Sequence, residues 1–134
     1  MVFPKEIIKI HRLACTARMK SYSPYSKFKV GCGLKADGKY YSGTNIENAS
    51  YGATLCAERV AIFKAISEGK KNISEIIIVI ESKKTGYPCA FCLQVMAEFC
   101  TPRTNIYLAN TKKITHHFKF HELLPYPFCP KNLI

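Results

Sequence analysis

Apolar side chains recur along the chain with either the spacing of a helix or the spacing of a strand. Each change from one spacing to the other marks the boundary of an expected element. Apolar residues recur with a helical spacing over residues 4–20, where basic side chains occupy many of the intervening positions. Residues 28–34 alternate as a strand does, from Phe28 onward, and the Asp37-Gly38 pair is typical of a hairpin turn. The N-terminal part therefore predicts a helix followed by a β-hairpin.

The middle of the chain predicts one helix and one buried strand. The helix is expected over residues 54–68, with Gly69 at its end, where glycine commonly terminates helices. The apolar residues spaced to share one face of this helix are Cys56, Val60, Phe63 and Ile66. Residues 76–80 form an unbroken β-branched run, which predicts a strand buried on both faces.

The C-terminal part predicts a third helix and two more strands. Pro88 suits a first helical turn, so a helix is expected over residues 89–99, with strands over 105–109 and 114–120. The order αββαβαββ indicates an α/β protein, with a mixed five-stranded sheet and helices packed against it. No repeat or linker divides the chain, so residues 1–134 are expected to form a single domain.

Charge and cysteine content narrow the classes of function. The 20 basic and 9 acidic residues give a formal charge of +11, but the lysines are scattered, which favours a solvated surface over a nucleic-acid partner. An odd number of cysteines (seven) and a charged N-terminus without a secretory signal predict reduced thiols in the cytoplasm. No apolar run approaches the ~20 residues of a membrane span. Closely spaced cysteines then point to metal binding or catalysis.

Two short motifs carry the candidate chemistry. Cys89 and Cys92 stand three residues apart at the start of a helix, where they share a face and can bind one tetrahedral ion. Cys56, at the start of the preceding helix, can add a third ligand, and Glu58 can reach back beside the metal. Three protein ligands leave a zinc position for water, and water beside a carboxylate suits hydrolytic deamination. The combined motif matches the zinc deaminases with three cysteine ligands.

The sequence resembles the small, homotetrameric cytidine deaminases over nearly its whole length. Five segments in the same order carry the resemblance, namely residues 22–31, 45–52, 56–59, 88–92 and 123–125. The resemblance implies a three-layer α-β-α fold with helices on both faces of the sheet. It implies the hydrolytic deamination of cytidine and deoxycytidine to uridine and deoxyuridine plus ammonia, as in pyrimidine salvage. It also implies a homotetramer with active sites shared between subunits.

The resemblance assigns the metal and the proton transfers to four residues. Cys56, Cys89 and Cys92 match the ligands of one zinc ion per chain. Glu58 matches the proton shuttle of the reaction, in which zinc-bound hydroxide attacks C4 of the pyrimidine. It would take the proton of the zinc-bound water and return protons to N3 and to the departing amine.

The resemblance also implies which residues bind the nucleoside. They are Phe28, Asn45, Glu47, Ala57, Tyr51 and Phe128. Asn45 and Glu47 match the pair that hydrogen-bonds the ribose 3′-hydroxyl. Tyr51 and Phe128 match aromatic residues that complete the pocket of a neighbouring subunit.

Positive charge near the thiolates is expected to matter, because three thiolates weaken zinc as a Lewis acid. The helix N-termini at Cys56 and Cys89 supply partial positive charge, and Arg59 can donate to a thiolate sulfur. The family usually has glycine and arginine where this chain has Ala90 and Leu93. We therefore expect Arg59 to offset much of the negative charge of the three thiolates.

Other readings of these motifs remain open at this point. A structural zinc site with Cys100 or another thiol as a fourth ligand would make the protein a non-catalytic interaction module, and a lone C-x-x-C can also be redox-active. A deaminase with this site could instead act on a related aminopyrimidine nucleoside or on a base in RNA. Asn45 and Glu47 favour a free ribose, and RNA-editing deaminases normally have histidine in the position of Cys56. An assay for ammonia release from cytidine separates these readings.

Overall fold

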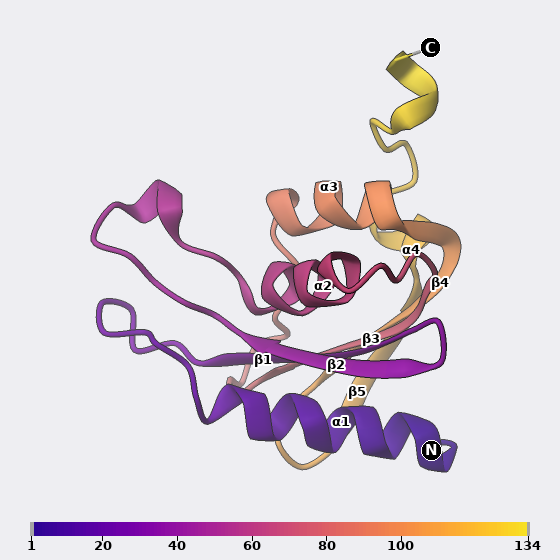
Figure 1. Cartoon of the computed structure of the whole chain (residues 1–134). Helices are drawn as coiled ribbons and strands as arrows, with labels where there is room; N and C mark the ends of the chain where they lie inside the picture. The colour runs from indigo at the N-terminus through magenta and orange to yellow at the C-terminus, as the bar shows by residue number, and fades with distance from the viewer. Residues whose placement is uncertain (1, 134) are drawn as a thin grey trace.

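The structure is a computed structural model that describes residues 2–133. Its centre is a five-stranded sheet with the strand order β2-β1-β3-β4-β5 (Figure 1). The strands are β1 (Val30–Ala36), β2 (Lys39–Thr44), β3 (Ile73–Ile80), β4 (Cys100–Ala109) and β5 (Ile114–Lys119). Of the neighbouring pairs in this sheet, β3 and β4 are parallel and the others antiparallel. The mixed sheet predicted from the sequence is therefore confirmed.

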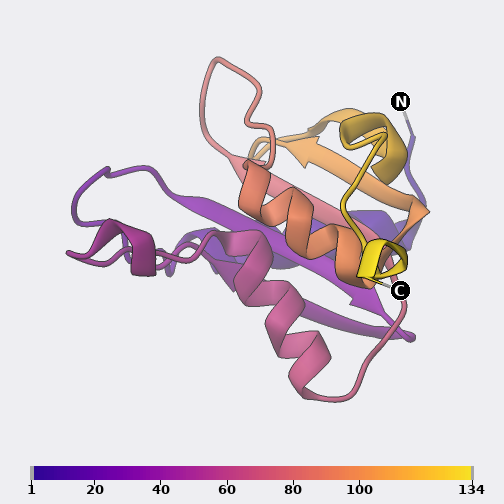
Figure 2. The same cartoon turned by 90° about the horizontal axis from the view of Figure 1, so that it is seen from above.

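Helices cover both faces of the sheet. Helix α1 (Lys5–Arg18) lies on one face, and α2 (Ala57–Ser67) and α3 (Ala90–Phe99) lie on the other (Figures 1 and 2). The short helices are η1 (Tyr51–Ala53), α4 (Phe120–Leu123) and η2 (Pro130–Leu133). This arrangement confirms the three-layer fold. Within residues 2–133, no helix has both the length and the hydropathy needed to cross a membrane.

Strand β3 joins the two apolar cores of the protein. Ile76 and Ile78 belong to the larger cluster, which also holds residues of α2 and α3, while Ile77 and Val79 belong to the cluster beneath α1. Residues 76–80 are all buried, as the β-branched run predicts. Burying each such side chain contributes about 1.5–3 kcal/mol, so this strand fixes the positions of the layers on both sides.

Two glycines let helices approach the sheet closely. A Cβ atom at Gly43 in β2 would lie 2.6 Å from the amide nitrogen of Ala61 in α2. A Cβ atom at Gly31 in β1 would lie 2.0 Å from the carbonyl oxygen of Ala14 in α1. Larger residues at either position would push a helix outward. The close packing of α2 matters for function, because the start of α2 carries the candidate site residues Cys56, Ala57, Glu58 and Arg59.

The hairpin between β1 and β2 has the predicted turn. Asp37 and Gly38 both have positive φ angles, 47° and 79°, as a type I′ turn requires. The Asp37 carboxylate also accepts a hydrogen bond from the backbone N–H of Lys71 (2.7 Å), which ties the turn to the segment before β3. The turn thus sets the register that pairs Ala36 with Lys39.

Some boundaries differ from the predictions. Phe28 is not part of a strand, because β1 begins at Val30, and the helix expected over residues 54–68 begins only at Ala57. The predicted apolar face of this helix is wrong, since Phe63 is 41% exposed. The buried residues of α2 are Ala57, Glu58, Ala61, Ile62 and Ala65. Its contact face therefore consists mainly of small residues.

Candidate metal and nucleoside site

Three cysteines converge at one edge of the sheet. Strand β1 lies between β2 and β3 and is antiparallel to both. The C-terminal ends of β2 and β3 therefore lie on either side of the start of β1, at this edge of the sheet. The chain leaves each of these ends to begin α2 and α3. Cys56 and Cys89 directly precede these helices with extended backbones, and Cys92 lies in the first turn of α3. The two helix starts therefore bring together sulfur atoms that are 33 residues apart in the sequence.

The sulfur atoms have the spacing of a zinc site. The Sγ atoms of Cys56 and Cys89 are 3.7 Å apart, and those of Cys89 and Cys92 are 3.5 Å apart. Tetrahedral zinc with Zn–S bonds of about 2.3 Å separates its sulfur ligands by roughly 3.8 Å. Within residues 2–133, this trio is the one group of potential ligands close enough to share a metal. Cys100 follows the far end of α3, so the four-cysteine reading lacks support.

Positive potential surrounds the Cys56 sulfur. An Nη2 N–H of Arg59 donates to Cys56 Sγ (3.5 Å) and to the carbonyl oxygen of Thr54 (3.2 Å). Hydrogen bonds from Cys92, Arg59 and Cys89, in decreasing order of effect, lower the pKa of Cys56 to about 5. The N-termini of α2 and α3 act in the same direction. These contacts stabilise Cys56 as the thiolate that binds metal, whereas the hydrogen bond to Cys56 and burial raise the pKa of Cys92.

Glu58 is a buried carboxyl group beside these sulfur atoms. Its residue is only 5% exposed. Burial raises the pKa of Glu58 to about 7, because the carboxylate loses its hydration, and the negative charge of Cys56 acts in the same direction. A carboxyl group with a pKa near neutrality can both accept and return protons at physiological pH.

A pocket of about 260 Å³ joins this cluster to most of the predicted nucleoside contacts. The predicted site residues that line it are Phe28, Asn45, Glu47, Cys56, Ala57, Glu58 and Cys89. The other residues that line it carry no functional signal in the sequence; they are Ser26, Val30, Thr54, Leu55, Ile78, Ile80, Gly86 and Tyr87. Their convergence on the pocket depends on the tertiary fold.

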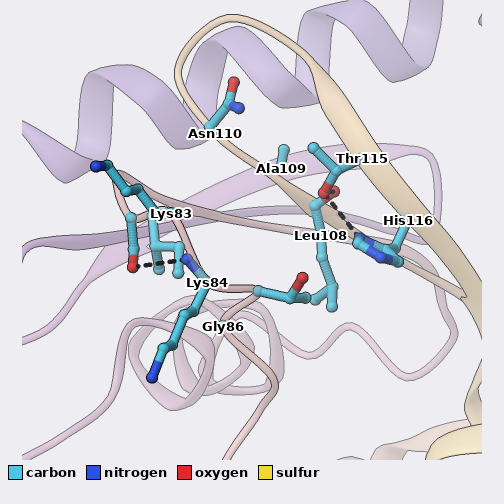
Figure 3. Close-up of a pocket in the computed structure, with 11 residues that line it drawn as sticks. Lys83, Lys84, Gly86, Leu108, Ala109, Asn110, Thr115 and His116 are labelled. Atoms are coloured by element: carbon cyan, nitrogen blue, oxygen red, sulfur yellow. Dashed lines mark hydrogen bonds between the residues drawn. The ribbon is translucent and has the colours of Figure 1, made fainter.

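A different cavity lies beside this pocket and holds none of the predicted site residues. Figure 3 shows it between the β3–α3 connection and the turn from β4 to β5, with Lys83, Thr115 and His116 among its lining residues. The side chain of Lys84 points away from His116 in this view. Ile80 and Gly86 line both cavities.

The polar residues of the pocket are held by a dense set of hydrogen bonds. Asn45 is buried, and its Oδ1 accepts from the Ser21 hydroxyl (2.6 Å) and from the N–H of Val30 (3.0 Å). Its Nδ2 donates to the carbonyl oxygen of Phe28 (2.7 Å). Glu47 accepts hydrogen bonds from Tyr25 and Ser26 in the loop between α1 and β1, and these bonds, chiefly that of the Ser26 hydroxyl, lower the pKa of Glu47. The side chain of Glu47 is therefore held as a carboxylate, which can accept hydrogen bonds from hydroxyl groups of a ligand.

Two predicted residues lie away from the pocket of their own chain. Tyr51 is 77% exposed on η1, which projects beyond the edge of the sheet (Figures 1 and 2), and its ring meets Tyr25 edge to face. Phe128 is 58% exposed in the C-terminal segment, where its carbonyl oxygen accepts a hydrogen bond from Gln94 Nε2 (2.8 Å). The expected role of these aromatic residues in a neighbouring subunit stays a prediction.

Comparison with known proteins identifies the family. Residues 4–108 match the family described as the cytidine and deoxycytidylate deaminase zinc-binding region. The chain belongs to this family. The match includes all three cysteines of the trio as well as Glu58, so a deaminase with a zinc cofactor accounts for the clustered thiols.

Individual members of the deaminase family resemble most of this chain. The cytidine deaminase of Halalkalibacterium halodurans is 46% identical over 121 residues, which cover 90% of this chain and 92% of that protein. That of Sporosarcina psychrophila is 43% identical over 118 residues, or 87% of each protein. The crystal structure of cytidine deaminase from Burkholderia pseudomallei has a TM-score of 0.86 at 38% identity, covering 94% of this chain and all of that chain.

The chain departs from the usual deaminase motif at Leu93. This side chain is half-buried and packs against the larger apolar cluster, so it contributes to the core rather than to the charge near the sulfur atoms. Within the described residues, Arg59 is the arginine that hydrogen-bonds a cysteine of the trio. This hydrogen bond supports the expectation that Arg59 offsets the negative charge of the thiolates.

Proposed function

We propose that this protein deaminates cytidine and deoxycytidine to uridine and deoxyuridine, releasing ammonia. The observation that carries the proposal is Glu58, a buried carboxyl group with a pKa near neutrality, beside three sulfur atoms spaced for zinc. Both lie in a pocket that also contains the buried amide of Asn45 and the carboxylate of Glu47. The membership of the chain in the deaminase family supports the same reaction.

Cys56, Cys89 and Cys92 hold one zinc ion in this proposal, and Glu58 performs the proton transfers. Zinc, when bound, polarises a water molecule and lowers its pKa toward neutrality. Glu58 would take one proton from the attacking water and pass it to N3 of the pyrimidine. It would then take the proton of the new C4 hydroxyl and pass it to the amine, which leaves as ammonia while the C4 carbonyl forms. Because its pKa is about 7, neither the acceptance nor the return of a proton is strongly uphill. Burial keeps bulk water away from the carboxyl group.

Other residues of the pocket orient the nucleoside. The backbone N–H of Ala57 belongs to the first turn of α2, where helix N–H groups lack partners within the helix, so it can donate to the carbonyl of the pyrimidine. In this proposal Asn45 and Glu47 bind the ribose 3′-hydroxyl, which cytidine and deoxycytidine share. Phe28, which is 44% exposed, offers its ring to the flat face of the nucleoside.

The assembly and location are part of the same proposal. We expect a homotetramer in which Tyr51 and Phe128 complete the pocket of a neighbour, because both are large aromatic residues that are exposed on the single chain. All seven cysteines are free, which suits the reducing cytoplasm.

Ammonia release by the zinc-loaded protein tests the proposed function. Cytidine and deoxycytidine should both be converted, whereas free cytosine and cytosine within an RNA oligonucleotide should react at least tenfold more slowly. The matched control is Glu58→Gln, which retains the shape of the side chain but cannot shuttle protons. Release from neither nucleoside would contradict the proposal and favour a non-catalytic zinc module, while faster release from RNA would favour an RNA substrate.

A further inference from the structure

The loop between α1 and β1 is fastened to the two polar residues of the nucleoside pocket. The backbone N–H groups of Tyr25 and Ser26 donate to Oε1 of Glu47 at 3.0 and 3.2 Å, and the Ser26 hydroxyl donates to Oε2. Two residues after Ser26, the carbonyl oxygen of Phe28 accepts a hydrogen bond from Nδ2 of Asn45 (2.7 Å). The loop and the pocket therefore form one hydrogen-bonded unit.

Ser26 connects the two sides of this unit. While its Oγ donates to the carboxylate of Glu47, the same Oγ accepts a hydrogen bond from the backbone N–H of Phe28 (3.0 Å). Between Ser26 and Phe28, Lys27 adopts a left-handed backbone conformation (φ 61°), which is uncommon for residues other than glycine. Such conformations persist where surrounding contacts hold them, and the Ser26 hydroxyl bridges this one.

The location of Glu47 shows which part of the ligand it faces. Ser26, Glu47 and Thr54 line the nucleoside pocket, and they also line an adjoining cavity of about 370 Å³ that the cysteines do not reach. The carboxylate thus lies at the end of the pocket away from the metal trio. A nucleoside whose pyrimidine faces Glu58 presents its sugar at that end, and a sugar hydroxyl is a hydrogen-bond donor for a carboxylate.

We propose that Ser26 is a positioning residue for sugar recognition: its hydroxyl orients the Glu47 carboxylate toward a hydroxyl of the nucleoside sugar. The inference rests on the proposed function, since it concerns how the same pocket binds its substrate. Ser26 acts through Glu47 rather than at the reacting ring. Its removal should therefore weaken binding of nucleosides that carry sugar hydroxyls and leave turnover nearly unchanged.

Steady-state kinetics of Ser26→Ala with cytidine and 2′,3′-dideoxycytidine test this inference. One hydrogen bond to a charged group is worth about tenfold in affinity, so KM for cytidine should rise about tenfold while kcat stays within about twofold. The KM for 2′,3′-dideoxycytidine, which lacks both hydroxyls, should not change. The preference for cytidine over the dideoxy analogue should therefore shrink about tenfold. A general disturbance of the pocket would weaken both substrates equally.

Two further variants complete the experiment. Ser26→Thr keeps the hydroxyl and should restore the KM for cytidine to within about threefold of wild type. Ser67→Ala removes an exposed hydroxyl that bonds only to the backbone of α2 and should leave both substrates unaffected. An unchanged preference in Ser26→Ala, or equal losses in Ser26→Ala and Ser26→Thr, would overturn the inference. Lack of cytidine turnover in the wild-type protein would instead contradict the proposed function.

Discussion

Replacing Arg59 by alanine should weaken zinc binding measurably. The variant removes the N–H group that donates to Cys56 Sγ at 3.5 Å, together with the positive charge that helps to hold Cys56 as a thiolate. It leaves the three sulfur atoms in place. The change therefore isolates the electrostatic environment of the metal from the ligand set itself.

The size of the effect follows from the geometry of this contact. A hydrogen bond that involves a charged group contributes about 1.5–3 kcal/mol, equivalent to roughly 10- to 150-fold in a dissociation constant. The lower end applies here, because the contact is long and the same Nη2 group also donates to Thr54. The helix N-termini at Cys56 and Cys89 remain in the variant and contribute about 0.3–1 kcal/mol each when exposed. We therefore expect zinc affinity to fall about tenfold.

Competition with a chromophoric zinc chelator measures the dissociation constant directly. Arg103→Ala is a suitable control, because Arg103 is an exposed arginine near the start of β4, at the opposite end of α3 from the trio. Both variants lose one positive charge, but only Arg59→Ala should release zinc more readily and deaminate more slowly. Zinc affinity within threefold of wild type in Arg59→Ala would refute the electrostatic reasoning.

Three more substitutions test the remaining parts of the site. Glu58→Gln should retain stoichiometric zinc by metal analysis and lose ~10²–10⁴-fold in turnover, because its amide cannot shuttle protons; activity within tenfold of wild type would show that another group does so. Cys89→Ala should lose both metal and activity, and full zinc content would remove Cys89 from the ligand set. Phe128→Ala should impair deamination without changing zinc content, whereas a wild-type protein that sediments as an active monomer would contradict shared sites.

The sequence predicted the elements whose signals are local. The β-branched run of β3 and the Asp37-Gly38 turn specify a buried strand and a hairpin through chemistry that needs no distant partner. The contact face of α2 was mispredicted because hydropathy weights large side chains. Gly43 lets α2 lie so close to β2 that small residues such as Ala57 and Ala61 fill the contact, which periodicity alone does not reveal.

The candidate site also contains residues with a local sequence signal and residues that only the fold brings together. The metal trio and Glu58 were predicted because zinc chemistry demands particular residue types at short spacings, and the structure places these groups together. Ser26 and Tyr87 carry no comparable signal, since serine and tyrosine are common and only the fold brings them to the pocket. Phe128 was assigned through family resemblance, and its exposure on a single chain leaves that role to be tested.

The three zinc ligands lie at the starts of two different helices, and this arrangement determines how zinc stabilises the fold. Cys89 and Cys92 are neighbours in the chain and can chelate zinc even when the protein is unfolded, whereas Cys56 joins them only after its helix has docked. Metal bound by the unfolded state does not favour folding. The net gain in unfolding free energy therefore comes mainly from capture of the Cys56 thiolate. Zinc held by all three cysteines therefore links α2 to α3, and we expect its removal to loosen the junction between these two helices first.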